Sequence, residues 1–191
     1  MTNSSPIGGP VSRVQYTIDG HDIITATSAG FAEFADENDA TGLSKQVLGQ
    51  PIWQFMYSEE VNAVYQRLFS AVRKGRRGVS MTFRCDSRDV LRFMKITVEP
   101  HTNGYLMIST DTLLEVPRAR VLSSQILYNS LKEGLPMCSH CNKIYLKRED
   151  SWMEIDTAVE AGMISDSLSV MFGLCGSCKR EFDSTIKGLQ P

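Results

Sequence analysis

Four of the five cysteines in this 191-residue chain form two Cys-x-x-Cys pairs, Cys138 with Cys141 and Cys175 with Cys178. This spacing lets two thiolates reach one metal ion from a tight turn, and zinc bound to sulfur at about 2.3 Å is the expected result. The segment 142–174 between the pairs is longer than in an ordinary zinc ribbon, so we expect it to fold into structure of its own. Four thiolates leave no open position for water, so this zinc is expected to be structural.

Two other uses of these cysteines are a redox dithiol and a pair of disulfides. A dithiol needs only one pair, and disulfides need an oxidising compartment. Residues 1–10 are rich in Ser, Gly and Pro and lack the basic and apolar regions of a signal peptide. No apolar run approaches the roughly 20 residues that span a bilayer. We therefore expect a cytoplasmic protein that does not enter membranes, with reduced thiols and Cys85 as a free thiol.

The charge of the chain argues against nucleic acid as its partner. Lys and Arg number 20, Asp and Glu number 22, and the segment 118–191 carries nine of each kind. Nucleic-acid binding relies on clustered cations, which are absent from this segment. The one basic cluster, 73–77, contains Gly75 and is expected to end a helix. Because the chain also lacks a P-loop, a G-x-S-x-G and an H-E-x-x-H motif, we expect no enzymatic activity.

Hydrophobic periodicity predicts the elements of the first part of the chain. A β-rich run at 22–27 leads into helical spacing at 28–35, and apolar residues at three- and four-residue steps over 57–73 predict a long helix. Strands are expected at 79–86, 90–99 and 105–111, and Asn103-Gly104 is a hairpin signal between the last two. Pro117 is expected to close this domain.

Side chains alternate along the first of these three strands. One face is expected to point into the core and carries Val79, Met81, Phe83 and Cys85, while the other carries Ser80, Thr82, Arg84 and Asp86. Arg84, Arg88 and Arg92 are expected to form a solvated face. Buried cysteine is usually a small hydrophobe, so a redox-sensing role for Cys85 is the less favoured alternative.

This order of elements, together with four short motifs, resembles the PAS domain family over about residues 15 to 115. The matching residues are Asp22-Ile23-Ile24, Phe31-x-x-Phe34-Ala35, Val47-Leu48-Gly49-x-x-Ile52-Trp53 and Phe83-Arg84-Cys85-Asp86-Ser87. The resemblance implies an α+β fold, in which a curved five-stranded antiparallel sheet and flanking helices enclose a small pocket that is empty or holds a ligand.

We expect that pocket to be lined by Trp53, Met81, Phe83 and Cys85, with Phe55 near its mouth or core. The ligand cannot be read from the sequence. Haem is not favoured, because His21 and His101 both lie in predicted turns. The Asn-Cys-Arg motif of flavin-adduct PAS proteins is absent.

Apolar residues in 118–135 recur with a spacing that predicts a helix. The PAS resemblance implies that such a helix connects the sensor to its output and pairs with its copy in a homodimer. Val121, Tyr128, Leu131 and Leu135 would otherwise form an exposed apolar patch, unless they pack on the sheet of their own chain.

Residues 135 to 185 resemble a small cysteine module found after PAS, GAF or receiver domains in bacterial signalling proteins. The matching residues are Leu135-Pro136-Met137-Cys138-Ser139-His140-Cys141-Asn142-Lys143-Ile144, Trp152 with Ile155, and Gly173-Leu174-Cys175-Gly176-Ser177-Cys178. Phe172 departs from that module, which usually has His there. Ser151-Trp152-Met153-Glu154 is a capping-box pattern that predicts a helix with Ile155, Ala158, Val159 and Met163 on one face. A second helix is expected after Cys178, which gives a treble-clef-like arrangement. His140 is expected to be exposed and not to bind the metal.

The expected organisation is thus a flexible N-terminus (1–14), a PAS sensor domain (15–117), a connector helix (118–135) and a zinc module (136–191). We expect a homodimeric cytoplasmic sensory protein whose PAS domain responds to a small ligand, redox state or partner and signals through the zinc module to a protein. The alternatives are a transcription regulator whose zinc module binds DNA, and a dimeric scaffold with an empty PAS pocket. Chelation of zinc is expected to unfold the chain from about residue 136 and to leave the PAS domain folded.

Overall fold

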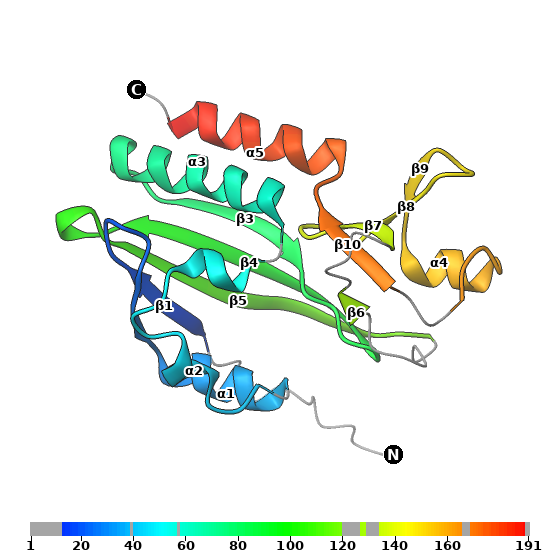
Figure 1. Ribbon diagram of the computed structural model, residues 1–191, viewed down its shortest axis with the longest axis horizontal. Helices are drawn as coiled ribbons and strands as arrows, with labels where there is room; N and C mark the ends of the chain where they lie inside the picture. The colour runs from blue at the N-terminus through cyan, green and yellow to red at the C-terminus, as the bar shows by residue number, and fades with distance from the viewer. Residues whose placement is uncertain are drawn as a thin grey trace, which may run out of the picture.

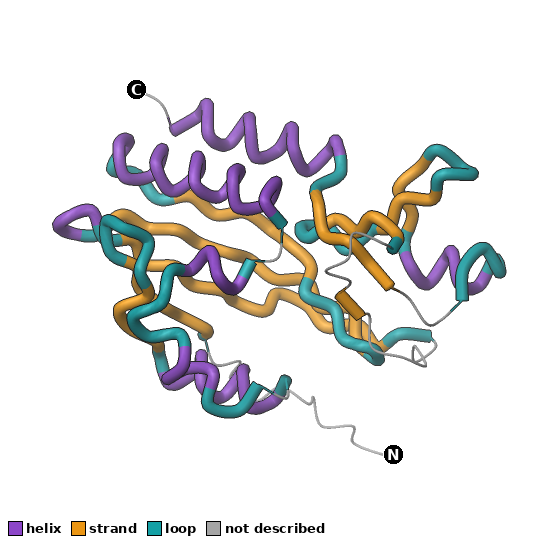
Figure 2. Tube along the Cα trace, viewed as in Figure 1, coloured by secondary structure: helices purple, strands orange, loops and turns teal. Residues whose placement is uncertain are grey.

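The computed structural model describes residues 13–38, 40–56, 58–119, 127–128, 134–165 and 169–189, with the backbone alone at 127–128. It is a mixed α+β fold with two five-stranded sheets, shown in Figure 1 and, by element type, in Figure 2. A row of helices covers one face of the larger sheet, and the smaller sheet lies beside one end of it.

The larger sheet is antiparallel throughout, as expected, and its strand order is β2-β1-β5-β4-β3. Its strands are β1 (Val14–Ile18), β2 (Ile24–Thr27), β3 (Val79–Arg84), β4 (Val90–Pro100) and β5 (Leu106–Pro117). The turn η2 (Thr102–Gly104) joins β4 to β5, with positive φ at Asn103 (58°) and Gly104 (78°). The predicted Asn-Gly hairpin is therefore confirmed. β5 continues beyond its predicted end at Asp111 and reaches Pro117, the residue expected to close the domain.

The register predicted for β3 is confirmed along the strand. Met81 is buried, and Val79 and Phe83 pack against the core, whereas Ser80 and Thr82 are exposed. The sheet face that carries Met81 therefore points toward the helices.

Four helical segments precede β3: α1 (Ala29–Glu37), α2 (Leu43–Gln46), η1 (Ile52–Phe55) and α3 (Glu59–Gly75). The hydroxyls of Ser28 and Ser58 accept hydrogen bonds from the backbone N–H groups of the first turns of α1 and α3, which fixes where both helices start. α3 is the predicted long helix, and it packs its apolar side on the sheet.

The cysteine-containing half forms the smaller sheet and two helices. Its elements are β6 (Leu127–Tyr128), β7 (Leu135–Cys138), β8 (Ile144–Leu146), β9 (Ser151–Met153), α4 (Ile155–Glu160), β10 (Ser169–Gly173) and α5 (Gly176–Leu189). The strand order is β6-β10-β7-β8-β9, and β10 runs parallel to both of its neighbours. The segment between the two cysteine pairs thus has structure of its own, as predicted. The capping box predicted at Ser151-Trp152-Met153-Glu154 is wrong, because Ser151–Met153 pair with β8 as β9 and the helix begins only at Ile155.

The single connector helix predicted over 118–135 is wrong. Leu127 and Tyr128 are extended and pair with β10, and Leu135 begins β7. A following proline disfavours helical backbone, and Leu135 precedes Pro136. Most of the remaining segment, 120–126 and 129–133, lies outside the described residues. Of the N-terminus predicted to be flexible, 1–14, residues 1–12 also lie outside them, and Val14 begins β1.

α3 and α5 run side by side in the same direction (Figure 1). Gly75, the last residue of α3, allows this approach, because a Cβ atom there would come within 2.5 Å of the Leu189 carbonyl oxygen. Phe182, Ile186 and Leu189 of α5 belong to the same buried cluster as the sheet residues Met81 and Ile96. The two predicted domains therefore share one hydrophobic core.

Candidate metal centre

Two turns bring the four cysteines of the Cys-x-x-Cys pairs together. Cys138 ends β7 and Cys141 follows it, while Cys175 precedes α5 and Cys178 lies in its first turn. All four Sγ atoms lie within 4.8 Å of one another, and those of Cys141 and Cys175 are 3.9 Å apart. A tetrahedral ion with metal–sulfur bonds of about 2.3 Å requires sulfur–sulfur distances of about 3.8 Å. The geometry fits a four-thiolate metal site, as the spacing predicted.

Backbone hydrogen bonds hold the first turn in shape. The N–H of Cys138 donates to the Lys143 carbonyl (2.8 Å), and the N–H of Asn142 donates to the Cys138 carbonyl (2.8 Å). Asn142 has a φ of 57°, which an asparagine tolerates better than most residues. The N–H of Ser139 donates to the Gly173 carbonyl (2.9 Å), so the two cysteine-bearing segments are also joined directly.

The thiols of the cluster form hydrogen bonds to one another. A bound metal cation could take the place of the protons in these hydrogen bonds. A hydrogen bond from the Cys141 thiol, helped by backbone N–H groups of both turns, lowers the pKa of Cys138 to about 4 against the effect of burial. The same hydrogen bond raises the pKa of Cys141. Burial, together with hydrogen bonding to Cys175, raises the pKa of Cys178. A bound metal ion would stabilise all four groups as thiolates.

His140 is buried, with 4% of its surface exposed, which corrects the expectation of an exposed side chain. Its ring packs edge-on against Phe182 (5.0 Å between centroids), and its Nε2 lies 3.9 Å from a carboxylate oxygen of Glu181 without a hydrogen-bond partner. Burial lowers the pKa of His140 and so disfavours the charged form of the ring. His140 is outside the cluster of four sulfurs, as predicted.

Residues 134–189, which carry the candidate metal site and are called the metal-binding half below for that reason, are attached to α3 by polar contacts. One Glu60 carboxylate oxygen accepts a hydrogen bond from the N–H of Leu174 (2.9 Å), and the other pairs with Lys179. Burial acts to raise the pKa of Glu60, but Lys179 and the Leu174 N–H outweigh it and lower that pKa. Two turns further along α3 and one turn further along α5, Arg67 pairs with Asp183 at 2.8 Å.

A second junction contradicts the solvated arginine face expected on β3 and β4. The Arg84 side chain is only 10% exposed; it pairs with Asp86 at 2.5 Å and reaches Glu154 at 3.4 Å. Asp86 also binds Arg118, whose side chain is 1% exposed and pairs with Asp156 at the start of α4. The metal-binding half covers this end of the sheet, which is why these charges are buried.

Arg92 is the second exception to the expected solvated face, because its side chain is only 14% exposed. It pairs with Glu115 at 2.7 Å and donates to the Cys85 carbonyl. Arg88 is exposed. The arginine face therefore divides into a buried, paired part and an exposed part.

The residues predicted to line a pocket lie in or beside the core. Trp53 packs on Phe69 with 5.7 Å between ring centroids, Met81 is buried, and Phe83 is half-buried. Cys85 is half-buried directly after β3, and burial raises the pKa of its thiol. A pocket lined by these four residues stays a prediction.

Two cavities that the structure does contain lie close to this region. One of about 200 Å³ is bounded by the sheet and the first helices, and one of about 290 Å³ by the sheet, α3 and the metal-binding half. Phe55, expected near the pocket, lines both. His21 and His101 are exposed in turns, as predicted.

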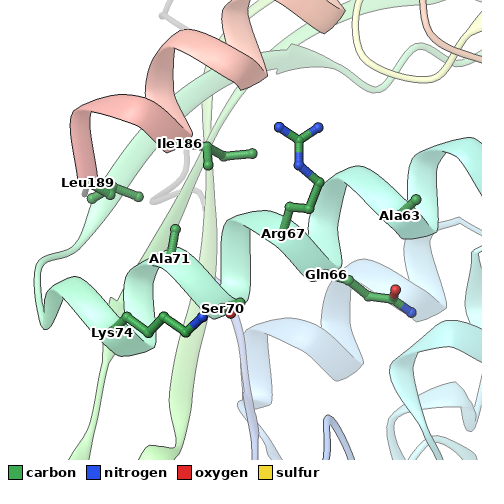
Figure 3. A pocket seen from close by; sticks show the side chains of 8 residues that line it. All are labelled: Ala63, Gln66, Arg67, Ser70, Ala71, Lys74, Ile186 and Leu189. Atoms are coloured by element: carbon green, nitrogen blue, oxygen red, sulfur yellow. The ribbon is translucent and has the colours of Figure 1, made fainter.

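The groove between α3 and α5 is larger, at about 570 Å³ (Figure 3). Ala71 of α3 points toward Ile186 and Leu189 of α5, and the Arg67 side chain extends beside them (Figure 3). The other lining residues come from α3 and are Ala63, Gln66, Ser70 and Lys74. None of the predicted site residues lines this groove.

No protein-family model matches this chain, and no curated protein matches it. Among the described residues, no helix combines the length and apolar character needed to cross a membrane.

Proposed function

We propose that this chain is a non-enzymatic sensory or regulatory protein, in which a PAS-type sheet domain acts on a zinc module that presents a surface to a protein partner. One observation carries the proposal: a single hydrophobic core runs from the sheet through α3 into α5. A structural change in the sheet domain would therefore alter the packing of the metal-binding half directly, because the two parts share this core. The strand order β2-β1-β5-β4-β3 and the sequence resemblance support the PAS assignment.

Zinc is the metal that best suits the cluster formed by Cys138, Cys141, Cys175 and Cys178. Four sulfur ligands at tetrahedral spacing favour zinc or iron, and one Cys-x-x-Cys turn combined with a second pair at a helix start gives a treble-clef-like zinc module. With four thiolates the ion has no position left for a substrate or for water. We propose that the ion holds α5 and β7 in place. We also propose that the protein has no catalytic activity.

We further propose that the protein is cytoplasmic, where its thiols stay reduced, and that it works as a homodimer. Exposed apolar side chains at the far end of the β4–β5 hairpin support self-association, because such groups are usually covered. They are Phe93, Leu113, Leu114 and Val116, which are 36% to 54% exposed.

Native mass spectrometry of the purified full chain, combined with sedimentation velocity, tests these points together. The expected result is a dimer with one zinc ion per chain. A metal-free protein with an unchanged, protease-resistant C-terminal half would contradict the zinc module. A monomer at micromolar concentration would contradict the dimer, and tight, salt-dependent binding to duplex DNA would contradict the protein-partner output in favour of a transcription regulator.

A further inference from the structure

The 290 Å³ cavity lies where the sheet domain meets the metal-binding half. Tyr16 of β1 and Tyr65 of α3 line it from one side, and Ser139, Asn142 and Phe172 line it from the other. Ser139 and Asn142 belong to the first cysteine turn, and Phe172 belongs to β10, whose residues contact α3 (Figure 1). Any occupant would therefore touch both halves of the molecule at once.

The lining of this cavity is uncharged. Its polar groups are the hydroxyls of Tyr16, Tyr65, Ser58 and Ser139 and the side-chain amide of Asn142, and its remaining side chains are apolar. Apolar walls with a few converging polar groups are typical of small-molecule sites. A cavity without an ionised side chain would bind a charged ligand poorly, because that ligand would lose its hydration without gaining a counter-charge.

Several of these polar groups are free to bind a ligand. In the part of the chain that the structure describes, the side chains of Tyr16, Tyr65 and Asn142 form no hydrogen bond. Their polar atoms are not fully buried, so they reach the space of the cavity. The cavity thus has unused hydrogen-bonding capacity.

Both tyrosines stay neutral. Burial raises the pKa of Tyr65 to about 12, and burial together with the nearby Tyr65 also raises the pKa of Tyr16. At physiological pH each hydroxyl can therefore donate a hydrogen bond as well as accept one.

We propose that this cavity binds an uncharged aromatic molecule of about two fused rings with a hydroxyl or carbonyl group. Its volume lies near the lower limit of ligand sites, about 300 Å³, which favours a compact ligand. Phe55 and Phe172 offer aromatic surface, while Tyr65, Ser139 and Asn142 offer hydrogen bonds. This inference deepens the proposed sensor role, because it identifies a ligand class and a site.

The site also has a route to the metal centre. The Tyr65 ring packs edge-on against Phe182 (5.3 Å between centroids), and Phe182 packs in the same way against His140, which lies between Cys138 and Cys141. A ligand that fixes Tyr65 would therefore also restrict the first cysteine turn.

Isothermal titration calorimetry of the metal-loaded 191-residue chain with 2-naphthol at pH 7.5 tests the site, with the anion 2-naphthoate as the charged counterpart. We expect saturable 1:1 binding of 2-naphthol and at least tenfold weaker binding of 2-naphthoate. Tyr65→Phe, which keeps the ring, should weaken binding about fivefold to tenfold. Ser139→Leu, which fills the cavity, should weaken it at least tenfold. The matched controls Tyr145→Phe and Ser177→Leu change residues that do not line the cavity and should bind like the wild type.

Absence of saturable 2-naphthol binding would overturn the proposal, as would equal binding of 2-naphthoate or equal losses in Ser139→Leu and Ser177→Leu. The calorimetric result is independent of the partner and of the oligomeric state. If a dimeric, zinc-loaded protein does not bind 2-naphthol, only the proposed ligand site is refuted. If a metal-free monomer binds 2-naphthol, the proposed function is refuted and the ligand site is supported.

Discussion

Cys85 differs from the other four cysteines in its surroundings, because it lies outside their cluster of sulfur atoms. Burial raises the pKa of Cys85, and this effect outweighs the opposing pull of the Arg92 guanidinium. Among the described residues, the cluster of four sulfurs does not include Cys85. Cys85 therefore behaves as a small apolar side chain, since the thiolate is the reactive form of cysteine.

We predict that Cys85 in the metal-loaded protein reacts with iodoacetamide at pH 7.5 at least about tenfold more slowly than in urea, because its thiolate fraction is lowered and its access is limited. Mass spectrometry of peptides from timed samples measures this directly. Labelling of Cys85 at the same rate in native and unfolded protein would show an accessible, reactive thiol, and would restore the redox-sensing role for this residue.

His140 and Cys141 are neighbours with different expected roles, since His140 packs in the core and Cys141 is a candidate metal ligand. We predict that His140→Phe keeps one metal ion per chain and changes the free energy of unfolding by less than about 1 kcal/mol, since replacing an unpaired buried polar ring by an apolar one is close to neutral. Cys141→Ser should lower the metal content, because it removes one of the four sulfur ligands. Elemental analysis after gel filtration distinguishes the two. Loss of metal from His140→Phe would make this histidine a ligand.

The sequence correctly predicted that the four cysteines come together, because each pair is close in sequence and its two-residue spacing suits a shared metal ion. It did not predict the burial of His140, because that burial depends on Phe182, which lies on a helix 42 residues later. Arg84 and Asp86 were misjudged for the same reason: their partners Arg118 and Glu154 come from the other half of the chain. Burial of a single side chain is a property of tertiary contacts, which periodicity does not contain.

At the scale of elements, polar contacts join the N-terminal ends of α3 and α5. Glu60 in the first turn of α3 binds both Lys179 of α5 and the backbone N–H of Leu174. A carboxylate that accepts such bonds has a lowered pKa, so its contribution to stability is present above the ordinary value of 4.5 and is lost as the pH falls through the lower value in the folded protein.

We predict that Glu60→Gln lowers the free energy of unfolding by about 1 kcal/mol at pH 7, a discounted value because the side chain is 42% exposed. This corresponds to a melting temperature about 2–4 °C lower. The difference from wild type should shrink below pH 4.5 and vanish in more acidic solution. Glu59→Gln, at an exposed position in the same turn, is the control. A deficit that persists unchanged at acidic pH would contradict the charge-based attachment.

The second attachment, at Arg118, is more deeply buried. Its guanidinium binds Asp86 (3.2 Å), Asp156 and the Ser87 carbonyl (2.9 Å). We predict that Arg118→Ala destabilises the fold by about 3 kcal/mol, because it leaves the carboxylate of Asp86, 3% exposed, without one of its two cations. Urea denaturation measures this, with Arg148→Ala at an exposed turn as the control. Equal stability of the two variants would show that the Arg118 contacts contribute nothing.

Long periodic segments were predicted well and pairings between distant segments were not. α3 and the β4–β5 hairpin follow from apolar spacing and from Asn103-Gly104. The parallel pairing of β10 with β6 and β7 joins segments far apart in the chain, and no local pattern marks it. The apolar spacing that suggested a helix over 118–135 was overridden by this pairing at Leu127 and Tyr128.

At the scale of the whole molecule, the two halves cannot be separated without exposing apolar surface. Phe182 is 1% exposed, and it belongs to the same buried cluster as Leu68, Phe69 and Val72 of α3. The sequence predicts that chelation leaves the PAS domain folded, with a connector helix between that domain and the zinc module. The shared core favours cooperative unfolding of both halves instead.

We therefore predict that chelation destabilises α3 together with the metal-binding half. A structural zinc site contributes on the order of 10 kcal/mol, which is comparable with the total stability of a domain of this size. Hydrogen–deuterium exchange before and after chelation should show faster exchange at Leu68, Phe69 and Val72 as well as in α5. Phe182→Ala, which opens a cavity between the helices without changing a ligand, should produce the same pattern more weakly, at a cost of about 3–5 kcal/mol. If α3 exchanges at an unchanged rate while α5 loses all protection, the sheet domain is stable by itself and the shared core does not couple the two halves.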